Sequence, residues 1–163
     1  MNIFVLDHDI RKCARYHADQ HVIKMILEST QLLCTVINLH GGKAPYKSTH
    51  IKHPCVYWAG ESAQNWRWLQ RLALALNDEY RYRYRKNTDH GSAIVARKLD
   101  PLDLPDTGLT EFAQAMPDAY KVPGDPVAAY RKFYIAEKSR FAKWTRRKPP
   151  SWYIEGIGNS NKY

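Results

Sequence analysis

Residues 16–33 read YHADQHVIKMILESTQLL, and this stretch decides the fold. Its residues recur at the three- and four-residue intervals that place side chains on common faces of an α-helix. One face is polar at every position, and this polar stripe consists of His17, His21, Lys24, Glu28 and Gln31. The rest of the circumference is apolar, with Val22, Ile23, Met25, Ile26, Leu27, Leu32 and Leu33. A helix this apolar is largely buried, so we expect the polar stripe to line an interior cleft.

Helix signals continue on both sides of this stretch. Asp9 is a good N-cap, and Gly41-Gly42 a good stop, for a helix over residues 10–39. A second helix is predicted over residues 55–86, because its three- and four-residue periodicity continues into the alternating run YRYRYRK at its end.

The last third of the chain adds one more long helix. Asp125-Pro126 is an N-cap followed by proline, which opens a helix. A short helix is expected near residues 108–115, and a Gly/Asn-rich tail closes the chain. The fold class is therefore mainly α: one compact domain over residues 1–163, with three long helices, short helices and long loops.

The charge points to a polyanionic partner. The 163 residues include 25 Lys and Arg against 16 Asp and Glu, a net charge of +9. Nucleic acid is the first candidate and an anionic membrane surface the second, with solubility alone as the plain alternative. Three cysteines without a CxxC pair fit a reducing compartment. The chain shows no signal peptide or membrane-spanning run, so we expect a cytoplasmic protein, in the host cytoplasm if it is viral.

Basic and aromatic residues are interleaved in the C-terminal segment 143–163 and just before it. Lys and Arg neutralise phosphates, and aromatic rings stack on exposed bases. The alternative is that the aromatic side chains are core and the basic ones a solvated face. We favour nucleic-acid binding, with Arg140, Lys143, Arg146, Arg147, Lys148, Trp152 and Tyr153 as the candidate contacts.

The polar stripe itself allows three interpretations. Lys24 and Glu28 form an i,i+4 pair that would stabilise a helix by a few tenths of a kcal/mol. His17 and His21 have the spacing of helical metal ligands, although the glutamate of the zinc peptidase motif is absent. A half-buried carboxylate beside an amine can instead carry out acid–base and Schiff-base chemistry.

Three segments resemble one enzyme family. ADQHVIKMILE (residues 18–28) is similar to the first helix of the phage-type pyrimidine-dimer DNA glycosylases, also called endonuclease V of the phage type. The loop from Tyr46 to His53-Pro54 resembles the turn into that family's second long helix, and RRKPPSWY (146–153) resembles its C-terminal aromatic segment. The whole chain also resembles proteins of tailed bacteriophages whose function is unassigned.

The resemblance implies roles for particular residues. Glu28 would be the catalytic carboxylate, Gln20 and His21 would hold the displaced nucleotide, and Trp152-Tyr153 would be the aromatic tail. The family's nucleophile is the α-amine of a small residue exposed by methionine removal, whereas this chain begins Met1-Asn2 and methionine is usually kept before Asn. The attacking amine would then belong to Met1 or Lys24. Gln31 stands where the family has a catalytic arginine.

We therefore expect a DNA glycosylase, with AP-lyase activity, that displaces a damaged or modified pyrimidine from double-stranded DNA. The expected catalytic residues are Glu28, Lys24, Met1 and His21, with His17, Gln20, Gln31 and His53 contacting the substrate. No cofactor, metal ion or membrane is expected to take part, and the protein is expected to be a monomer. The alternatives are a non-catalytic nucleic-acid-binding phage accessory protein, a DNA base-modifying enzyme and a metal-dependent hydrolase using His17 and His21.

Overall fold

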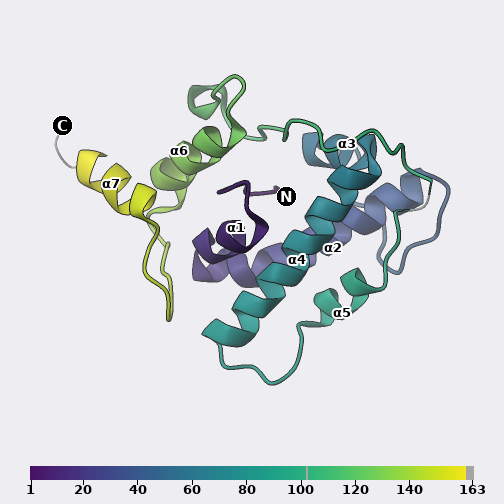
Figure 1. The fold of residues 1–163 in the computed structure, drawn as a ribbon, viewed down its shortest axis with the longest axis horizontal. Helices are drawn as coiled ribbons and strands as arrows, with labels where there is room; N and C mark the ends of the chain where they lie inside the picture. The colour runs from purple at the N-terminus through teal and green to yellow at the C-terminus, as the bar shows by residue number, and fades with distance from the viewer. Residues whose placement is uncertain (102, 161–163) are drawn as a thin grey trace.

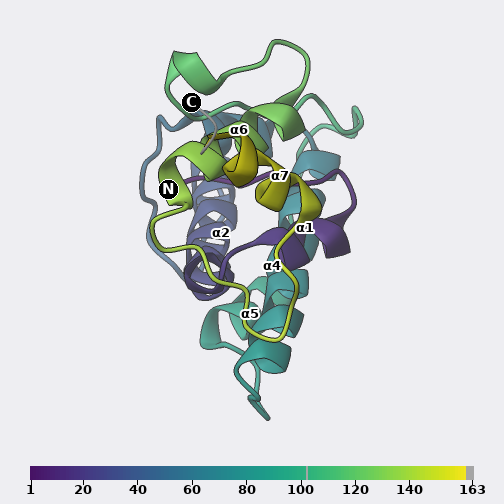
Figure 2. The same cartoon turned by 90° about the vertical axis from the view of Figure 1, so that its left-hand side faces the viewer.

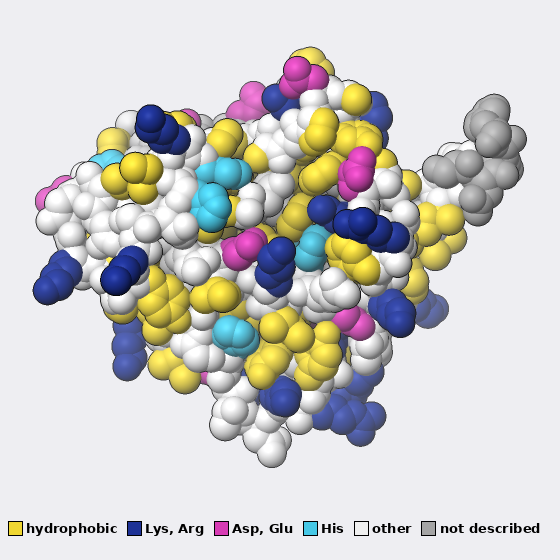
Figure 3. Space-filling model, turned by 180° about the vertical axis from the view of Figure 1, so that it is seen from behind, with side chains coloured by type: hydrophobic (Ala, Val, Ile, Leu, Met, Phe, Trp, Pro, Cys, Tyr) yellow, Lys and Arg dark blue, Asp and Glu magenta, His cyan; other side chains and the backbone are white. Residues whose placement is uncertain are grey.

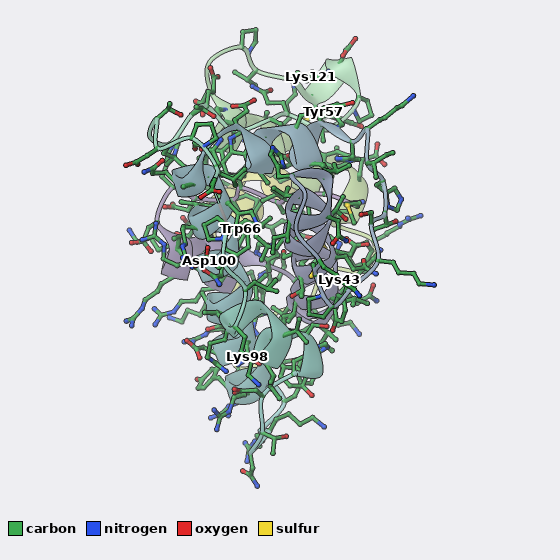
Figure 4. The ribbon with its side chains drawn as sticks, turned by 90° about the vertical axis from the view of Figure 1, so that its right-hand side faces the viewer. Lys43, Tyr57, Trp66, Lys98, Asp100 and Lys121 are labelled. Atoms are coloured by element: carbon green, nitrogen blue, oxygen red, sulfur yellow. The ribbon has the colours of Figure 1, made fainter. Side chains whose placement is uncertain are left out.

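The computed structural model describes residues 1–101 and 103–160, and every regular element within them is helical, as the sequence predicts (Figure 1). Two long helices, α2 (Asp19–Leu39) and α4 (Ala63–Arg83), pack against each other at the centre. Trp66 of α4 lies in the interior, completely buried, and its indole N–H donates to the Leu33 carbonyl oxygen at 3.2 Å (Figure 4). This hydrogen bond joins the two central helices.

Shorter helices surround the central pair. Three of them contact it directly: α1 (Ile10–Tyr16), α3 (Pro54–Glu61) and α5 (Gly91–Arg97). The other two, α6 (Pro126–Lys138) and α7 (Ser151–Ser160), pack on each other and cover one end of the molecule, nearest the viewer in Figure 2. By length and composition α2 could also cross a membrane, but 61% of its most apolar window is buried inside the protein, as in a core helix.

The single helix predicted over residues 10–39 is wrong, because it is interrupted at His17 and Ala18, whose backbones are extended. The Arg83 guanidinium donates to the His17 carbonyl oxygen at 2.7 Å and to that of Arg15 at 2.8 Å. The Tyr134 hydroxyl accepts the Ala18 N–H at 2.8 Å. These distant partners satisfy backbone groups that a continuous helix would pair internally, so tertiary contacts end α1.

The helix predicted over residues 55–86 is likewise divided in two, at Ser62. Its backbone is extended and its hydroxyl oxygen accepts the Asn65 N–H at 3.0 Å, which caps α4. The Ala63 N–H at the start of α4 donates to the Pro105 carbonyl oxygen at 2.8 Å. The run YRYRYRK does begin inside α4, which ends at Arg83.

The short helix predicted near residues 108–115 is wrong, because this segment is irregular. Asn65 accepts the Thr110 N–H at 2.9 Å and donates to the Thr110 hydroxyl at 2.7 Å. The Phe112 ring packs against Trp58 and Trp68, with centroid distances of 5.0 and 4.6 Å. Side chains of α3 and α4 thus supply the partners that a local helix would otherwise provide.

The C-terminal third of the chain begins with the helix that the sequence predicts. Asp125 caps α6 as predicted, since its carboxylate accepts the Ala128 N–H at 3.1 Å. Further along, residues Ser151–Ser160 form α7, whose Gly156 lies so close to α6 that a Cβ there would collide with the Ile135 side chain. Glycine therefore allows this close helix contact.

Candidate active site

The first residues of the chain form a non-helical segment that carries the α-amine to α2. Asn2 anchors this segment: its amide donates to the Ala115 carbonyl oxygen at 2.8 Å, and its oxygen accepts from the Tyr130 hydroxyl at 2.8 Å. The Met1 side chain is only 1% exposed, although the residue as a whole is half-buried, so its accessible part is the backbone that carries the amine.

Two amines approach the same carboxylate oxygen. The α-amine nitrogen of Met1 lies 3.9 Å from Oε1 of Glu28, and Nζ of Lys24 also lies 3.9 Å from that oxygen. The side chains differ in exposure, with 17% for Glu28 and 63% for Lys24. The Lys24 ammonium is therefore well solvated, whereas the Met1 amine belongs to an anchored residue beside a half-buried carboxylate.

His21 forms a third part of this site. Its ring stacks on Phe4, with centroids 4.4 Å apart and planes inclined by 10°, and its Nδ1 lies 2.8 Å from the Tyr134 hydroxyl oxygen. Burial, followed by the positive charges of His17, Lys138 and Lys24, lowers the pKa of His21 to about 3. The imidazole is therefore neutral at physiological pH.

The hydrogen bonds of Tyr134 fix the tautomer of this imidazole. The Tyr134 oxygen accepts the Ala18 N–H, and its own proton has His21 Nδ1 as acceptor. A buried hydroxyl proton without an acceptor would be costly, which favours donation to Nδ1. A neutral imidazole that accepts at Nδ1 carries its proton on Nε2. His21 thus offers an N–H donor within the residues that line the site.

His53 comes to the same place from the loop before α3. Its Nδ1 accepts the Cys55 N–H at 3.0 Å and caps α3. Burial lowers the pKa of His53, and the positive α-amine of Met1 lowers it further, against the opposing effects of the Met1 backbone and Glu28. His53 is therefore a neutral ring close to the amine and the carboxylate.

Met1, His21, Lys24 and Glu28 line a pocket of about 150 Å³, whose lining does not include His53. Sequence reasoning did not place the five other lining residues there: Asn2, Phe4, Met25, Phe133 and Lys138. Burial, followed by the charge of Arg140, lowers the pKa of Lys138, which Glu137 opposes. Phe133 and Lys138 belong to α6, more than 100 positions from Glu28, and no local pattern signals such a contact. The lining residues that the sequence did place at the site are Met1, His21, Lys24 and Glu28.

Other members of the polar stripe lie outside this pocket. His17 is completely buried in the core, where its Nδ1 lies 2.7 Å from the Cys13 carbonyl oxygen, so the prediction that it contacts substrate is wrong. Gln20 is exposed, and Gln31 is half-buried in a neighbouring hollow formed with residues 45–49. Within residues 1–101 and 103–160, no group of three or more His, Cys, Asp or Glu side chains is arranged to hold a metal ion.

The basic C-terminal residues divide into a solvated and a structural set. Arg147 is paired with the carboxylate of Glu79 at 2.6 Å. Trp152 is half-buried, and Tyr153 is buried against Trp144, with ring centroids 4.6 Å apart. These aromatic rings are therefore packed inside the fold rather than held out for stacking on bases. The exposed basic side chains here are those of Arg140, Lys143, Arg146 and Lys148.

The sequence of this chain also matches a known protein family. The model of the family described as pyrimidine dimer DNA glycosylase matches residues 1–91. This match covers more than half of the chain, from the N-terminal segment through α4, and includes both Met1 and Glu28. No curated protein and no solved structure matches the chain. The protein belongs to the pyrimidine dimer DNA glycosylase family, whose substrate is DNA.

Proposed function

We propose that this protein is a DNA glycosylase and AP lyase that acts on damaged or modified pyrimidines in double-stranded DNA, with the α-amine of Met1 as its nucleophile. The observation that carries the proposal is the 3.9 Å separation between that amine and Glu28 Oε1. An amine beside a carboxylate has both functions that this chemistry needs, a nucleophile and a group that moves protons.

The reaction begins when the neutral amine attacks C1′ of the deoxyribose. The bond between C1′ and the base nitrogen breaks, and its electron pair leaves with the base, which then takes up a proton. After the attacking amine loses a proton, its lone pair forms a C=N bond to C1′ as the C1′–O4′ bond breaks. The electron pair of that bond goes to O4′, which takes up a proton. Glu28 can accept the amine proton and return it to O4′. Loss of a C2′ proton from this imine then expels the 3′-phosphate.

The other residues of the pocket suit an anionic substrate. Lys24 and Lys138 bring positive charge to the pocket that Glu28 also lines, and His21 offers an N–H donor without adding charge. Because the nearby His53 ring is neutral, it adds no charge, and the Glu28 carboxylate balances the positive charge of the amine. The exposed basic side chains at 140–148 would neutralise backbone phosphates of the bound duplex. We propose that one protein molecule carries out the whole reaction.

The test is borohydride trapping on two duplexes, one with a natural abasic site and one with a thymine dimer. Borohydride reduces the imine to a stable amine, and mass mapping of the cross-linked peptide identifies the nucleophile. We expect a cross-link at Met1 that is lost in Glu28→Gln and retained in Lys24→Met. Glu155→Gln, which changes an exposed glutamate of α7, is the matched control.

Two other outcomes of the trapping experiment would contradict this assignment. A cross-link that maps to Lys24 and disappears in Lys24→Met would transfer the nucleophile to that side chain. Tight binding to both duplexes without cross-link or strand cleavage would contradict the proposed enzymatic activity. It would indicate that the protein binds DNA without catalysis.

A further inference from the structure

In the first half of α2, the apolar side chains of Ile23 and Leu27 face solvent. Ile23 is 37% exposed and Leu27 is 41% exposed, although the sequence predicted that both would be buried with the other apolar residues of the helix. They are four residues apart, so they lie one above the other on the helix surface. Together they form an apolar ridge one helical turn long, which no other described element covers.

The apolar ridge borders the active-site pocket. Lys24 and Glu28 each follow one of its residues along the chain, and both line that pocket. Leu27 also lines the neighbouring hollow of about 450 Å³, together with Gln31 and residues 45–49. The ridge therefore stands beside the reacting groups and along the edge of a second depression.

Charge around the apolar ridge suits DNA. Lys24 is 63% exposed beside it, and Lys47 is exposed on the far wall of the second hollow. In Figure 3, which shows the molecule from behind, histidine, acidic and basic side chains gather near the centre of the face, with hydrophobic side chains around them. Lysines attract phosphates, whereas exposed aliphatic groups gain nothing from phosphates and gain by contact with the apolar faces of the bases.

We propose that Ile23 and Leu27 enter the base stack of bound duplex DNA and hold open the base step next to the reacting nucleotide. This inference rests on the proposed action at a sugar within duplex DNA. Apolar side chains inserted between base pairs unstack the step, and the added protein contact offsets the cost. Opening the step also gives the amine access to C1′, which the stacked duplex shields.

The experiment uses full-length protein and a duplex in which 2-aminopurine lies next to a tetrahydrofuran abasic analogue. The fluorescence of 2-aminopurine rises when the base is unstacked, and the analogue cannot form an imine. The test variant is Ile23→Ser/Leu27→Ser. The control is Leu109→Ser/Ile154→Ser, which changes exposed apolar residues of 52% and 56% exposure on other segments. Circular dichroism and sedimentation check folding and oligomeric state.

At saturating protein, we expect wild type and control to raise the fluorescence and the test variant to give less than about one third of that rise. On a duplex with a natural abasic site, the test variant should still be trapped by borohydride within about threefold of wild type, because there is no base to displace. An equal fluorescence rise in the test variant would overturn the proposal. Parallel loss of the fluorescence rise and of trapping would also overturn it, because that result would indicate that Ile23 and Leu27 act in DNA binding. A dimer formed by the wild type but not by the test variant would overturn it as well.

The two proposals fail in different ways. In one case the wild type unstacks the reporter base, the test variant does not, and neither is trapped on abasic DNA. This result would support the insertion of Ile23 and Leu27 and contradict the proposed amine chemistry. In the other case Met1 is trapped and the test variant unstacks the reporter base as the wild type does. This result would support the proposed amine chemistry and contradict the insertion of Ile23 and Leu27.

Discussion

The hydroxyl of Tyr134 lies 2.8 Å from Nδ1 of His21, so a residue of α6 sets the hydrogen bonding of a pocket residue on α2. The same hydroxyl accepts the Ala18 N–H at the break between α1 and α2. One buried oxygen thus connects the start of α2, a lining residue of the pocket and the C-terminal third of the protein.

Tyr134→Phe should affect both stability and the pocket. The buried Ala18 N–H would lose its partner, which costs about 1–3 kcal/mol. His21 would lose the donor that keeps the proton on Nε2, so trapping on abasic DNA should slow more than that of Tyr57→Phe, a change at a 59% exposed tyrosine. Urea unfolding and single-turnover trapping measure the two effects. Unchanged stability would show that the Ala18 N–H finds another partner.

Arg83 should be among the most sensitive residues for stability. It is completely buried, pairs with Glu79 at 2.9 Å and Asp19 at 3.1 Å, and also binds two backbone carbonyls. Burial alone would raise the pKa of Glu79, but hydrogen bonds from Arg147 and Arg83 outweigh it and lower that pKa. Arg83→Met should therefore cost about 3–5 kcal/mol. Lys86→Met, at an exposed position, should be near neutral in the same urea titration.

His17 should make the protein sensitive to acid. Burial lowers the pKa of His17 to about 4 from the ordinary value of 6.5, and no acceptor contacts its Nε2. Because its folded pKa is the lower one, the stabilisation is present above pH 6.5 and is lost as the pH falls towards 4. Urea titrations at pH 7 and pH 4.5 should show a larger loss for wild type than for His17→Asn. A change of exposed His8→Asn should leave the wild-type difference intact.

Blocking the α-amine should abolish trapping at Met1 without unfolding the protein. A Gly-Ser extension before Met1 turns the amine into an amide, which is not a nucleophile. The new glycine amine lies two residues further from Glu28, so we expect no imine at Met1 and much weaker trapping, with full trapping when the same dipeptide is added at the other end of the chain. Mass spectrometry must show that each variant carries its intended terminus. Normal trapping by the N-terminally extended protein, with the cross-link mapped to a residue other than the added glycine, would exclude Met1 as the nucleophile.

Two glycines of α7 should respond oppositely to alanine. A Cβ at Gly156 would collide with the Ile135 side chain, whereas nothing lies within 4 Å of a Cβ at Gly158. Gly156→Ala should therefore destabilise the protein by about 1–3 kcal/mol through overpacking. Gly158→Ala should be neutral, or stabilising by up to about 1 kcal/mol, because alanine favours helix. Thermal unfolding of the two variants provides the comparison.

The features that could be predicted from the sequence are local ones. The periodicity of residues 16–33 and the Asp125-Pro126 cap each depend on neighbours within about four positions, and the structure contains both α2 and α6. The Lys24–Glu28 pair is local in the same sense, since both residues lie on one turn of α2. Such features need no knowledge of the rest of the fold.

The features that could not be predicted depend on distant partners. The break at His17 and Ala18 is stabilised by Arg83 and Tyr134, which are 66 and 116 positions away from them. Phe133 enters the pocket from α6 for a similar reason. The exposure of Leu27 also escaped prediction, because apolar periodicity shows that a face is apolar but not whether another element covers it.

The anchoring of Asn2 has a consequence for the order of events during synthesis. Asn2 is bonded to Ala115 and Tyr130, which lie 113 and 128 positions further along the chain. During synthesis, Asn2 can therefore be anchored beside Glu28 only after Ala115, and Tyr130 in the first half of α6, have been made. A nascent chain that has not yet released α6 lacks Phe133 and Lys138 of the pocket, so we expect the protein to become reactive only after α6 has left the ribosome.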